Sequence, residues 1–566
     1  MKIKEETQVP SYLQALAGSI ADFFASRENS EQAVNFGKIC ERLAIKTTEG
    51  STHLTPPEYI DLCSDPSIFA AVGSPIEGLP LVLTQNGNLY FNRFYQYEHT
   101  ILQAISTRAE KPFRLIEPAF HQFYDRYVRE YLDSSQALAV GVALQREFCI
   151  LTGGPGTGKT RTIAYILACQ LASNADLRIA LCAPTGKAAN RMYRSLMQSI
   201  EQSRLPESSE SALKLCSRTQ TIHRLLGPVE GSVDFKHNAD NPIPYDLVLV
   251  DEASMVDFSL MAKLCEALSP LAQLILVGDA NQLSPVQGGA VFSGLVNGLP
   301  VNEFSTEQLA VLHNFSDIGS KSKCPERLTG CMVSLTRTHR QDPASDYNAI
   351  GELCLAISKG DSVDALTILK GKNNSLDFIE PSEDVSIDDL IKSGFNRLNS
   401  STSPSEALAA LGDFKILCAH NQGQYGVDNW NERAKSLLVN AEETPYPVVI
   451  GANDYSVGLF NGDDGVIMDR KGFFPELGDP RMVARPRLPK HTLGYACSIH
   501  RSQGSEYDQV LIVLPTKESR LLTRELLYVA VSRAKSKLIL VGAKESLKAA
   551  INNVQTSPGG LLDFCD

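Results

Sequence analysis

The stretch from Gly153 to Thr160 matches the pattern G-x-x-x-x-G-K-[ST] at every fixed position. In this pattern the backbone N–H groups of a glycine-rich turn surround phosphate oxygens, and the lysine and hydroxyl side chains complete the site. We expect Lys159 to reach the β- and γ-phosphates of ATP and Thr160 to ligate Mg²⁺. The alternative is a glycine-rich turn without a ligand. The residues expected to bind the nucleotide here are Gly153, Gly154, Pro155, Gly156, Thr157, Gly158, Lys159 and Thr160.

Two carboxylates and an amide follow apolar runs further along the chain. Asp251 and Glu252 come directly after the run 247–250. At the carboxyl end of a parallel strand, Asp251 can hold Mg²⁺ while Glu252 orients or deprotonates the attacking water. Gln282 lies shortly after the run 274–277, where its amide is placed to contact the γ-phosphate. This set indicates hydrolysis of the nucleotide rather than its storage.

Hydrolysis at phosphorus also requires cations, because charge gathers on the transferred phosphoryl oxygens in the transition state. The candidates are Arg340, in the segment 338–341, and Arg533, in the segment 531–535. Both are expected on a second wall of the site. In that arrangement ATP bridges two domains, and its hydrolysis opens and closes the cleft between them.

These groups need strands and helices to position them. The run 148–151 predicts a short buried strand before the phosphate loop, and residues 160–172 carry apolar residues at helical spacing after it. Continuous apolar runs are typical of parallel strands buried on both faces. Further runs of this kind lie at 177–183, 247–250, 274–277, 416–419, 510–514 and 538–541. The pattern predicts an α/β protein with two parallel sheets.

The chain divides into three expected domains: 1–110, 111–335 and 336–566. The first is mostly helical, with a β-hairpin around Asn86-Gly87, and its aromatic block 90–97 either packs in a small core or faces a partner or a nucleic acid. The second and third are the α/β domains. The segment at about 441–490 is rich in Pro, Gly and β-branched residues, which predicts a small β module inserted in the third domain.

Composition limits the function classes. The chain has 566 residues, 43% of them hydrophobic, and lacks both an apolar stretch long enough to span a bilayer and a signal-peptide pattern at its start, so a cytoplasmic protein with no membrane contact is expected. A net charge of −12 argues against bulk electrostatic binding of nucleic acid, which leaves a local groove or a basic partner. The 13 cysteines include no C-x-x-C pair and are expected to be buried thiols.

Several segments, in order along the chain, resemble the motifs of superfamily 1 helicases. They are Gln136, the phosphate loop, 183–189, 221–227, 251–255, 278–283, 498–506 and 522–535. Together they are similar to the RecD family, the alpha subunits of exodeoxyribonuclease V. The resemblance implies RecA-like folds for both α/β motor domains and an SH3-like β module. The N-terminal domain, which has no catalytic motif, is expected to dock partners.

The resemblance also implies a function, namely a DNA-dependent ATPase that enters at duplex DNA ends and moves 5′ to 3′ along one strand. It further implies that the chain is part of a helicase–nuclease with beta and gamma subunits (RecB and RecC), which processes double-strand breaks. By the same resemblance, Gln136 contacts adenine. The residues implied to line the single-strand path are Pro184, Thr185, Thr221, His223, Ser502 and Gln503. His223 taken alone is more typical of a packed core histidine.

Two alternatives stay open at this level. One is a stand-alone 5′-to-3′ helicase of the same superfamily, and the other is an ATP-gated regulatory subunit that does not translocate. The intact Lys159, Glu252, Gln282 and Arg533 argue against the second. No spaced acidic cluster with a lysine suits a separate metal-dependent nuclease, so exonuclease activity is expected only through the complex.

Overall fold

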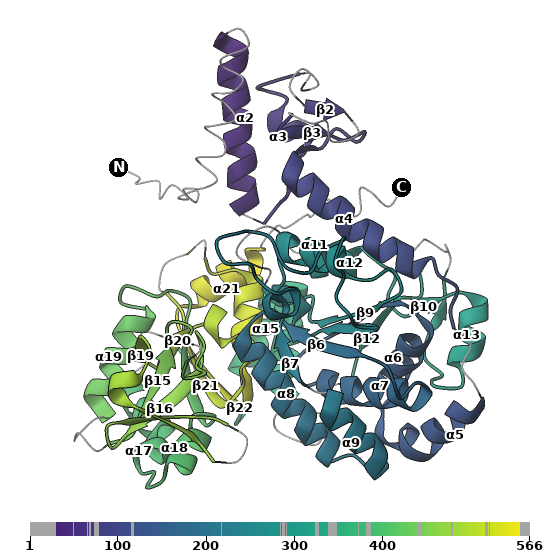
Figure 1. Ribbon diagram of the computed structural model, residues 1–566. Helices are drawn as coiled ribbons and strands as arrows, with labels where there is room; N and C mark the ends of the chain where they lie inside the picture. The colour runs from purple at the N-terminus through teal and green to yellow at the C-terminus, as the bar shows by residue number, and fades with distance from the viewer. Residues whose placement is uncertain are drawn as a thin grey trace.

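The computed structural model describes residues 30–48, 50–64, 66, 70–72, 79–114, 118–216, 218–283, 285, 289, 291–322, 328–337, 348–371, 373–380, 386–438, 444–454, 456–476, 479–515, 519 and 521–554. Two bodies lie side by side in Figure 1, each built on a parallel sheet, and a smaller N-terminal part stands above them. Across the described residues, the helices are too short or too polar to span a lipid bilayer.

The first parallel sheet has six strands in the order β12-β5-β9-β8-β6-β7. Alternate residues of its central strands point to opposite faces, and both faces are buried: Ile150 and Val250 pack on one side, Leu151 and Leu249 on the other. This confirms the prediction of parallel strands covered on both faces. The strands are β5 Phe148–Gly153, β6 Ile179–Ala183, β7 Thr219–Thr221, β8 Leu247–Val250, β9 Gln273–Gly278 and β12 Met332–Leu335.

Helices cover both faces of this sheet (Figure 1). They are α5 Pro118–Tyr127, α6 Ser134–Gln145, α7 Lys159–Ser173, α8 Gly186–Glu201, α9 Glu207–Cys216, α10 Ile222–Leu226, α11 Phe258–Ala267, α12 Val291–Gly298 and α13 Thr306–Leu312. Short 3₁₀ helices η2 Arg129–Tyr131 and η3 Ala253–Met255 and the parallel pair β10 Glu303–Phe304 and β11 Ser320–Lys321 complete this body.

The second parallel sheet has five strands in the order β13-β22-β21-β14-β20. The strands are β13 Leu376–Ile379, β14 Phe414–Cys418, β20 Ala496–Ser498, β21 Tyr507–Val513 and β22 Ala534–Val541. The helices around them are α14 Asn348–Lys359, α15 Ser362–Lys370, α16 Ile387–Gly394, α17 Asn396–Asn399, α18 Pro404–Ala410, α19 Val427–Leu438, α20 Arg524–Val531 and α21 Lys544–Asn552, with the 3₁₀ helix η5 His500–Ser502. The predicted α/β class with two parallel sheets is therefore confirmed.

A separate antiparallel sheet is inserted between β14 and β20. Its order is β18-β17-β16-β15-β19, and Val448, Ile450, Ile467 and Phe474 form a small core of its own. This sheet, here called the β module, begins and ends within a few residues of the predicted insertion. Its elements are β15 Tyr446–Ile450, β16 Asp464–Met468, β17 Lys471–Phe474, β18 Arg481–Ala484, η4 Arg485–Arg487 and β19 His491–Leu493. The SH3-like topology stays a prediction.

The N-terminal part combines helices with a four-stranded sheet in the order β1-β4-β3-β2. The predicted hairpin is confirmed, since β3 and β4 pair antiparallel around Gly87. Tyr90 and Tyr95 are buried, so this part of the aromatic block is core. Helix α4 continues into the body built on the first parallel sheet, where Ile101 and Ile105 join the core of that body. The elements are α2 Ser30–Thr48, β1 His53–Leu54, α3 Pro56–Tyr59, β2 Ala70–Val72, β3 Leu81–Leu83, β4 Leu89–Phe91 and α4 Asn92–Ala109.

The cysteines behave as expected where the structure describes them. Those described are free thiols, and most are buried, among them Cys149, Cys182 and Cys418. Burial raises the pKa of each of these three thiols. They therefore act as small apolar side chains within the sheets.

Candidate functional site

The phosphate loop, residues 153–160, joins β5 to α7 at the carboxyl edge of the first sheet. Gly156 and Gly158 have φ values of 76° and 78°, in the left-handed region that glycine adopts without steric cost. The Lys159 ammonium donates to the carbonyl oxygens of Gly153, at 2.7 Å, and Gly154, at 3.0 Å. The loop thus curls around the lysine at the N-terminus of α7, where free N–H groups favour an anion.

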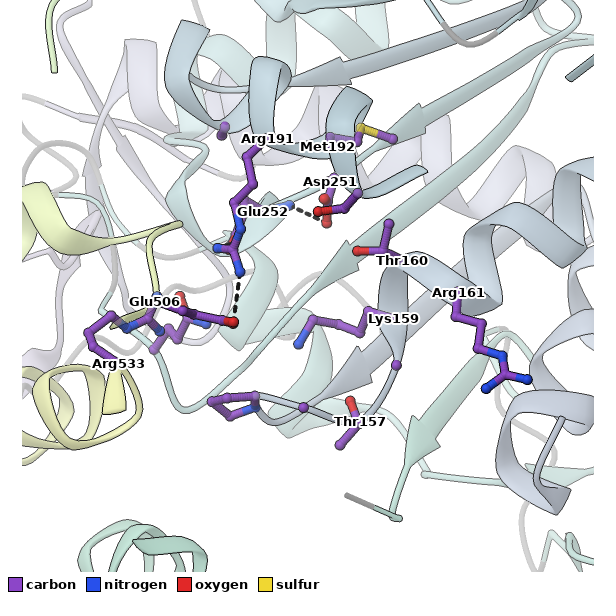
Figure 2. Close-up of a pocket in the computed structure, with 16 residues that line it drawn as sticks. Thr157, Lys159, Thr160, Arg161, Arg191, Met192, Asp251, Glu252, Glu506 and Arg533 are labelled. Atoms are coloured by element: carbon purple, nitrogen blue, oxygen red, sulfur yellow. Dashed lines mark hydrogen bonds and ion pairs between the residues drawn. The ribbon is translucent and has the colours of Figure 1, made fainter. Parts of the chain in front are cut away.

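A pocket of about 320 Å³ opens beside this loop and is lined from both parallel-sheet bodies (Figure 2). Its size lies in the range typical of small-molecule sites. Five of the six predicted catalytic residues line it, namely Lys159, Asp251, Glu252, Gln282 and Arg533. The sixth, Arg340, lies outside the described residues.

The pocket carboxylates stand at the end of β8. Glu252 has a φ of 52°, an uncommon conformation for a residue with a side chain, and its N–H donates to Asp251 Oδ1 at 2.9 Å. Burial, and next the charge of Glu252, raise the pKa of Asp251 above its ordinary value. Two adjacent, half-buried carboxylates of like charge repel each other, and a cation in the pocket would offset this repulsion.

Unpaired polar atoms at this site fit a bound ligand. Within the described part of the chain, Glu252 Oε2 and Gln282 Oε1 are buried without a hydrogen-bond partner. No group of three or more His, Cys, Asp or Glu side chains is placed there to hold a metal by itself. The available oxygens, on Thr160 and Asp251, are hard donors, and so few protein ligands suit an ion that is shared with phosphate oxygens.

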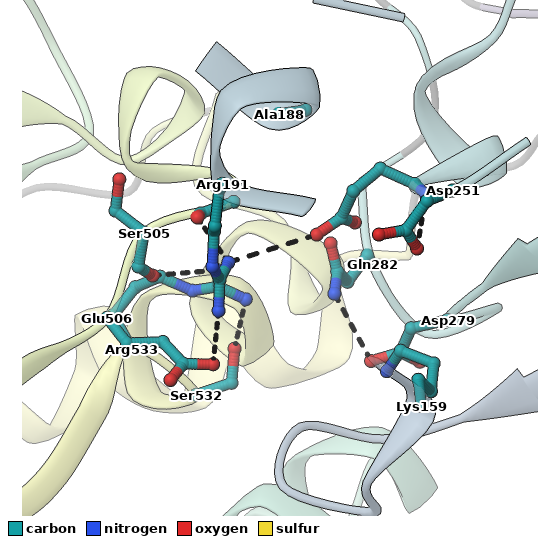
Figure 3. Close-up of polar contacts among 12 residues, drawn as sticks. Lys159, Ala188, Arg191, Asp251, Asp279, Gln282, Ser505, Glu506, Ser532 and Arg533 are labelled. Carbon is teal, nitrogen blue, oxygen red and sulfur yellow. Dashed lines mark hydrogen bonds and ion pairs between the residues drawn. The ribbon is translucent and has the colours of Figure 1, made fainter. Parts of the chain in front are cut away.

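Arg533 provides a cation on the opposite wall, at the end of α20. It is 2% exposed, and its guanidinium donates to Val529 O at 3.0 Å. It also donates to Ser505 O at 3.0 Å and to Ser532 Oγ at 2.9 Å (Figure 3). Burial lowers its pKa, and Glu252 acts in the opposite direction. Three bonds within its own domain fix the direction in which this buried charge faces the pocket.

A hydrogen bond that the sequence did not indicate crosses between the two bodies. The Tyr528 hydroxyl, from α20, donates to Asp279 Oδ2 at 3.1 Å, just beyond the end of β9. Asp279 is 1% exposed, and burial raises its pKa. A Cβ added to Gly154 would lie 3.3 Å from the Tyr528 hydroxyl oxygen, so the ring also lies against the phosphate loop.

Sequence reasoning also missed Arg191, on α8. Its guanidinium lies 2.7 Å from the Glu506 carboxylate, donates to Gly504 O, and lies 4.0 Å from Glu252 Oε1 (Figures 2 and 3). Burial opposes its charge, but Glu506 and Glu252 outweigh burial and raise its pKa. In the sequence, Arg191 stands out only by lying one helical turn after Lys187, and this spacing does not indicate which residues Arg191 contacts.

Gln136 lies behind the phosphate loop. It is fully buried, its Nε2 donates to Thr157 O at 3.1 Å, and its Oε1 accepts from Asp133 N at 3.2 Å in the N-terminal cap of α6. It therefore supports the loop in this structure. Its predicted contact with adenine stays a prediction.

The residues implied for the strand path lie near one another on the first sheet. Thr185 caps α8 and Thr221 caps α10, each accepting a backbone N–H at 3.2 Å. The strands that precede them, β6 and β7, are parallel neighbours, so both caps lie at one edge. Pro184 is half-buried beside them. His223 is exposed, with its ring 5.8 Å from Phe235, so it is not a packed core histidine.

The second body supplies Ser502 and Gln503. Gln503 is half-buried. Ser502 is fully buried, and its hydroxyl donates to Ile499 O at 2.6 Å within the η5 turn. The hydroxyl is thus held within this turn, and the predicted contact of Ser502 with a strand stays a prediction.

The β module contacts the first body next to these residues. Lys187, on α8, pairs with Asp464 at 2.7 Å, and the Arg224 guanidinium lies 5.1 Å from the centre of the Phe460 ring. A Cβ added to Gly186 would lie 3.4 Å from that ring. The module is thus attached to the starts of α8 and α10.

Comparisons with known proteins agree with this geometry. Residues 136–288 match the family model described as an AAA domain, and residues 493–541 match the UvrD-like helicase C-terminal domain. The first match covers the phosphate loop and the pocket carboxylates. The second covers η5 and the whole of β22, and it includes Arg533.

Curated relatives extend the similarity over nearly the whole chain. The RecBCD enzyme subunit RecD of Mycolicibacterium smegmatis is 33% identical over 94% of this chain and 91% of its own length. The subunit of the same name from Mycobacterium tuberculosis is 32% identical over 98% and 93%. The ATP-dependent RecD2 DNA helicase of Deinococcus radiodurans is 27% identical over 84% of this chain and 58% of its own length. The chain belongs to the RecD family of RecBCD enzyme subunits.

Proposed function

We propose that this chain is the ATP-dependent 5′-to-3′ DNA helicase subunit of a helicase–nuclease with RecB and RecC subunits, which unwinds and processes double-strand DNA breaks in the cytoplasm. The observation that carries the proposal is the pocket between the two parallel-sheet bodies. The phosphate loop and the carboxylates line one wall, and Arg533 lines the other. A nucleotide bound there contacts both bodies, so its hydrolysis changes how they meet.

The residues of the pocket divide the chemistry among them. Lys159 and the loop N–H groups bind the β- and γ-phosphates, and Thr160 and Asp251 hold Mg²⁺, which stabilises the charge on the phosphate oxygens. Glu252 orients the attacking water through its unpaired buried oxygen, and Gln282 contacts the γ-phosphate through its own. Gln136 binds the adenine edge.

Arg533 supplies positive charge to the transferred phosphoryl group, and Arg340 is proposed to add to it. Because Arg533 is anchored by three hydrogen bonds within the second body, its charge reaches the phosphate only when the cleft closes. Closure and hydrolysis are therefore linked through this residue.

The strand path runs over the edge that carries Pro184, Thr185, Thr221 and His223, and continues to Ser502 and Gln503 on the second body. Hydroxyl, imidazole and amide groups suit phosphate contacts that do not depend on sequence. Opening and closing of the cleft changes the spacing between the two sets of contacts. The bound DNA strand then advances along the protein each time one ATP is hydrolysed.

The same proposal assigns the domains. Residues 111–335 and 336–566 form RecA-like motor domains, the second carrying the SH3-like β module, and residues 1–110 dock to the partner subunits. Cutting of DNA is assigned to a partner chain, because the sequence has no spaced acidic cluster with a lysine that suits a separate metal-dependent nuclease.

The test is DNA-stimulated ATP hydrolysis by the assembled complex, comparing Arg533→Ala with Lys535→Ala. Lys535 is an exposed cation two residues further on, 3.9 Å from Asp508, and does not line the pocket. We expect Arg533→Ala to lower kcat about 100-fold or more, as loss of a charge-stabilising donor does. Lys535→Ala should retain the wild-type kcat. Full stimulated turnover by Arg533→Ala would contradict the proposed site.

A further inference from the structure

Arg191 is a pocket residue whose polar contacts lie on both sides of the cleft. It belongs to α8 of the first body, yet it pairs with Glu506 at 2.7 Å and donates to Gly504 O, both in the loop between η5 and β21 of the second body. These contacts exist only while the two bodies are together. Arg191 therefore responds directly to closure of the cleft.

The same guanidinium lies 4.0 Å from Glu252, the proposed water-orienting carboxylate. Glu252 is next to Asp251, and the repulsion between two adjacent carboxylates is offset by a nearby cation. A planar guanidinium with five N–H groups can address two carboxylates and a carbonyl at once, whereas an ammonium is a single point charge. Arg191 thus lies between Glu252 and Glu506, which are carboxylates of opposite walls of the cleft.

Helix α8 joins this contact to the proposed strand path. It is capped by Thr185, and Lys187 in its first turn pairs with Asp464 of the β module. Arg191 follows Lys187 by four residues, so both side chains lie on one face of the helix. A shift at the start of α8 therefore moves the guanidinium relative to Glu252.

We propose that Arg191 is a positioning residue that couples closure of the cleft to the orientation of Glu252 for hydrolysis. In the closed cleft, Glu506 and Gly504 hold the guanidinium in place, and it in turn holds Glu252. When the cleft opens, Arg191 loses two of its three partners, and Glu252 loses its fixed orientation. This rests on the proposed ATP hydrolysis, and it adds a reason why turnover depends on the bound strand.

The test uses the assembled complex, with ATP turnover measured with and without single-stranded DNA and the affinity for a fluorescent ADP analogue measured separately. We expect Arg191→Ala to lower the DNA-stimulated kcat at least tenfold, to lower the ratio of stimulated to basal turnover, and to change the affinity for the ADP analogue less than threefold. Arg191→Lys should recover part of the stimulated rate. The matched control is Arg194→Ala, an exposed cation on the same helix that does not line the pocket.

A second variant separates coupling from folding damage. Glu506→Gln leaves Arg191 in place but weakens its contact with the opposite wall, so the stimulated kcat should fall, and the double variant with Arg191→Ala should be no worse than Arg191→Ala alone. Equal loss of basal and stimulated rates in Arg191→Ala, or additive losses in the double variant, would overturn the inference. Wild-type complex without turnover would instead contradict the proposed function, so the two failures are distinguishable.

Discussion

Replacing Tyr528 with Phe removes one hydroxyl and with it the hydrogen bond to Asp279 that joins the two bodies at the nucleotide pocket. Both side chains are buried, Asp279 at 1% and Tyr528 at 5% exposure. A hydrogen bond to a charged group contributes about 1.5–3 kcal/mol. Because the bond exists only when the cleft is closed, the ratio of closed to open forms should fall by roughly 10- to 150-fold.

The loss should also depend on pH. Burial raises the pKa of Asp279, and the hydrogen bond from Tyr528 is among the contacts that lower it. Without the hydroxyl this pKa rises further, so the protonated carboxyl becomes more common as the pH falls. Because the hydroxyl stabilises the ionised carboxylate, its contribution is lost as Asp279 becomes protonated, and we therefore expect the defect in kcat/KM for ATP to be smaller at the acid end of the activity range than at pH 8.

The assay is DNA-stimulated ATPase activity of the complex at several pH values, with Tyr495→Phe as the matched control. The Tyr495 hydroxyl is buried in the second body and has no hydrogen-bond partner in the described part of the chain, so its removal breaks no contact between the bodies. If Tyr528→Phe retained the wild-type kcat/KM at every pH, the hydrogen bond would not stabilise the closed cleft and the reasoning would be refuted.

Three further predictions follow from the site and the β module. Glu252→Gln should lower kcat about 100-fold or more while nucleotide affinity, measured by fluorescence, stays close to wild type; unchanged turnover would remove Glu252 from the mechanism. Burial opposes ionisation of Asp464, but the charges of Lys187 and Lys415 outweigh burial and lower the pKa of Asp464 to about 2. The ionised Asp464 therefore contributes about 2 kcal/mol to the stability of the folded chain above pH ~4, and this contribution is lost as the pH falls towards 2. Asp464→Asn should accordingly speed hydrogen exchange at the start of α8 at neutral pH but not below pH ~2. Phe460→Ala removes the contact with Arg224 and should release a labelled single strand several-fold faster from the complex; an unchanged release rate would contradict a role for the module at the strand path.

The sequence predicted the elements whose signals are local. The apolar runs located the strands to within a few residues: β6 begins at Ile179 rather than at 177, and β14 begins at Phe414 rather than at 416. The phosphate loop and the β8 carboxylates were found because each chemistry depends on adjacent residues. The hairpin at Gly87 was found because turn residues separate two apolar runs.

The contacts between the two bodies could not be predicted in this way. Arg191 and Gly504 are 313 positions apart, and Tyr528 and Asp279 are 249 apart. Each of these residues has an ordinary helix or loop context, and only the packing of the two sheets brings them together. The burial of Ser502 could not be predicted either, because the turn that encloses its hydroxyl depends on the backbone of η5 and is not visible in the motif.

The most direct test of the central claim is unwinding of duplexes that carry either a 5′ or a 3′ single-stranded tail, with ATP and Mg²⁺. It should be measured first with the purified chain alone and then with the RecB and RecC subunits, and the unwinding that remains in a complex carrying Lys159→Ala should be subtracted. We predict unwinding only from the 5′ tail and only in the assembled complex. Unwinding by the isolated chain would identify a stand-alone helicase, and no unwinding in any mixture despite nucleotide binding would contradict the account and identify a regulatory subunit.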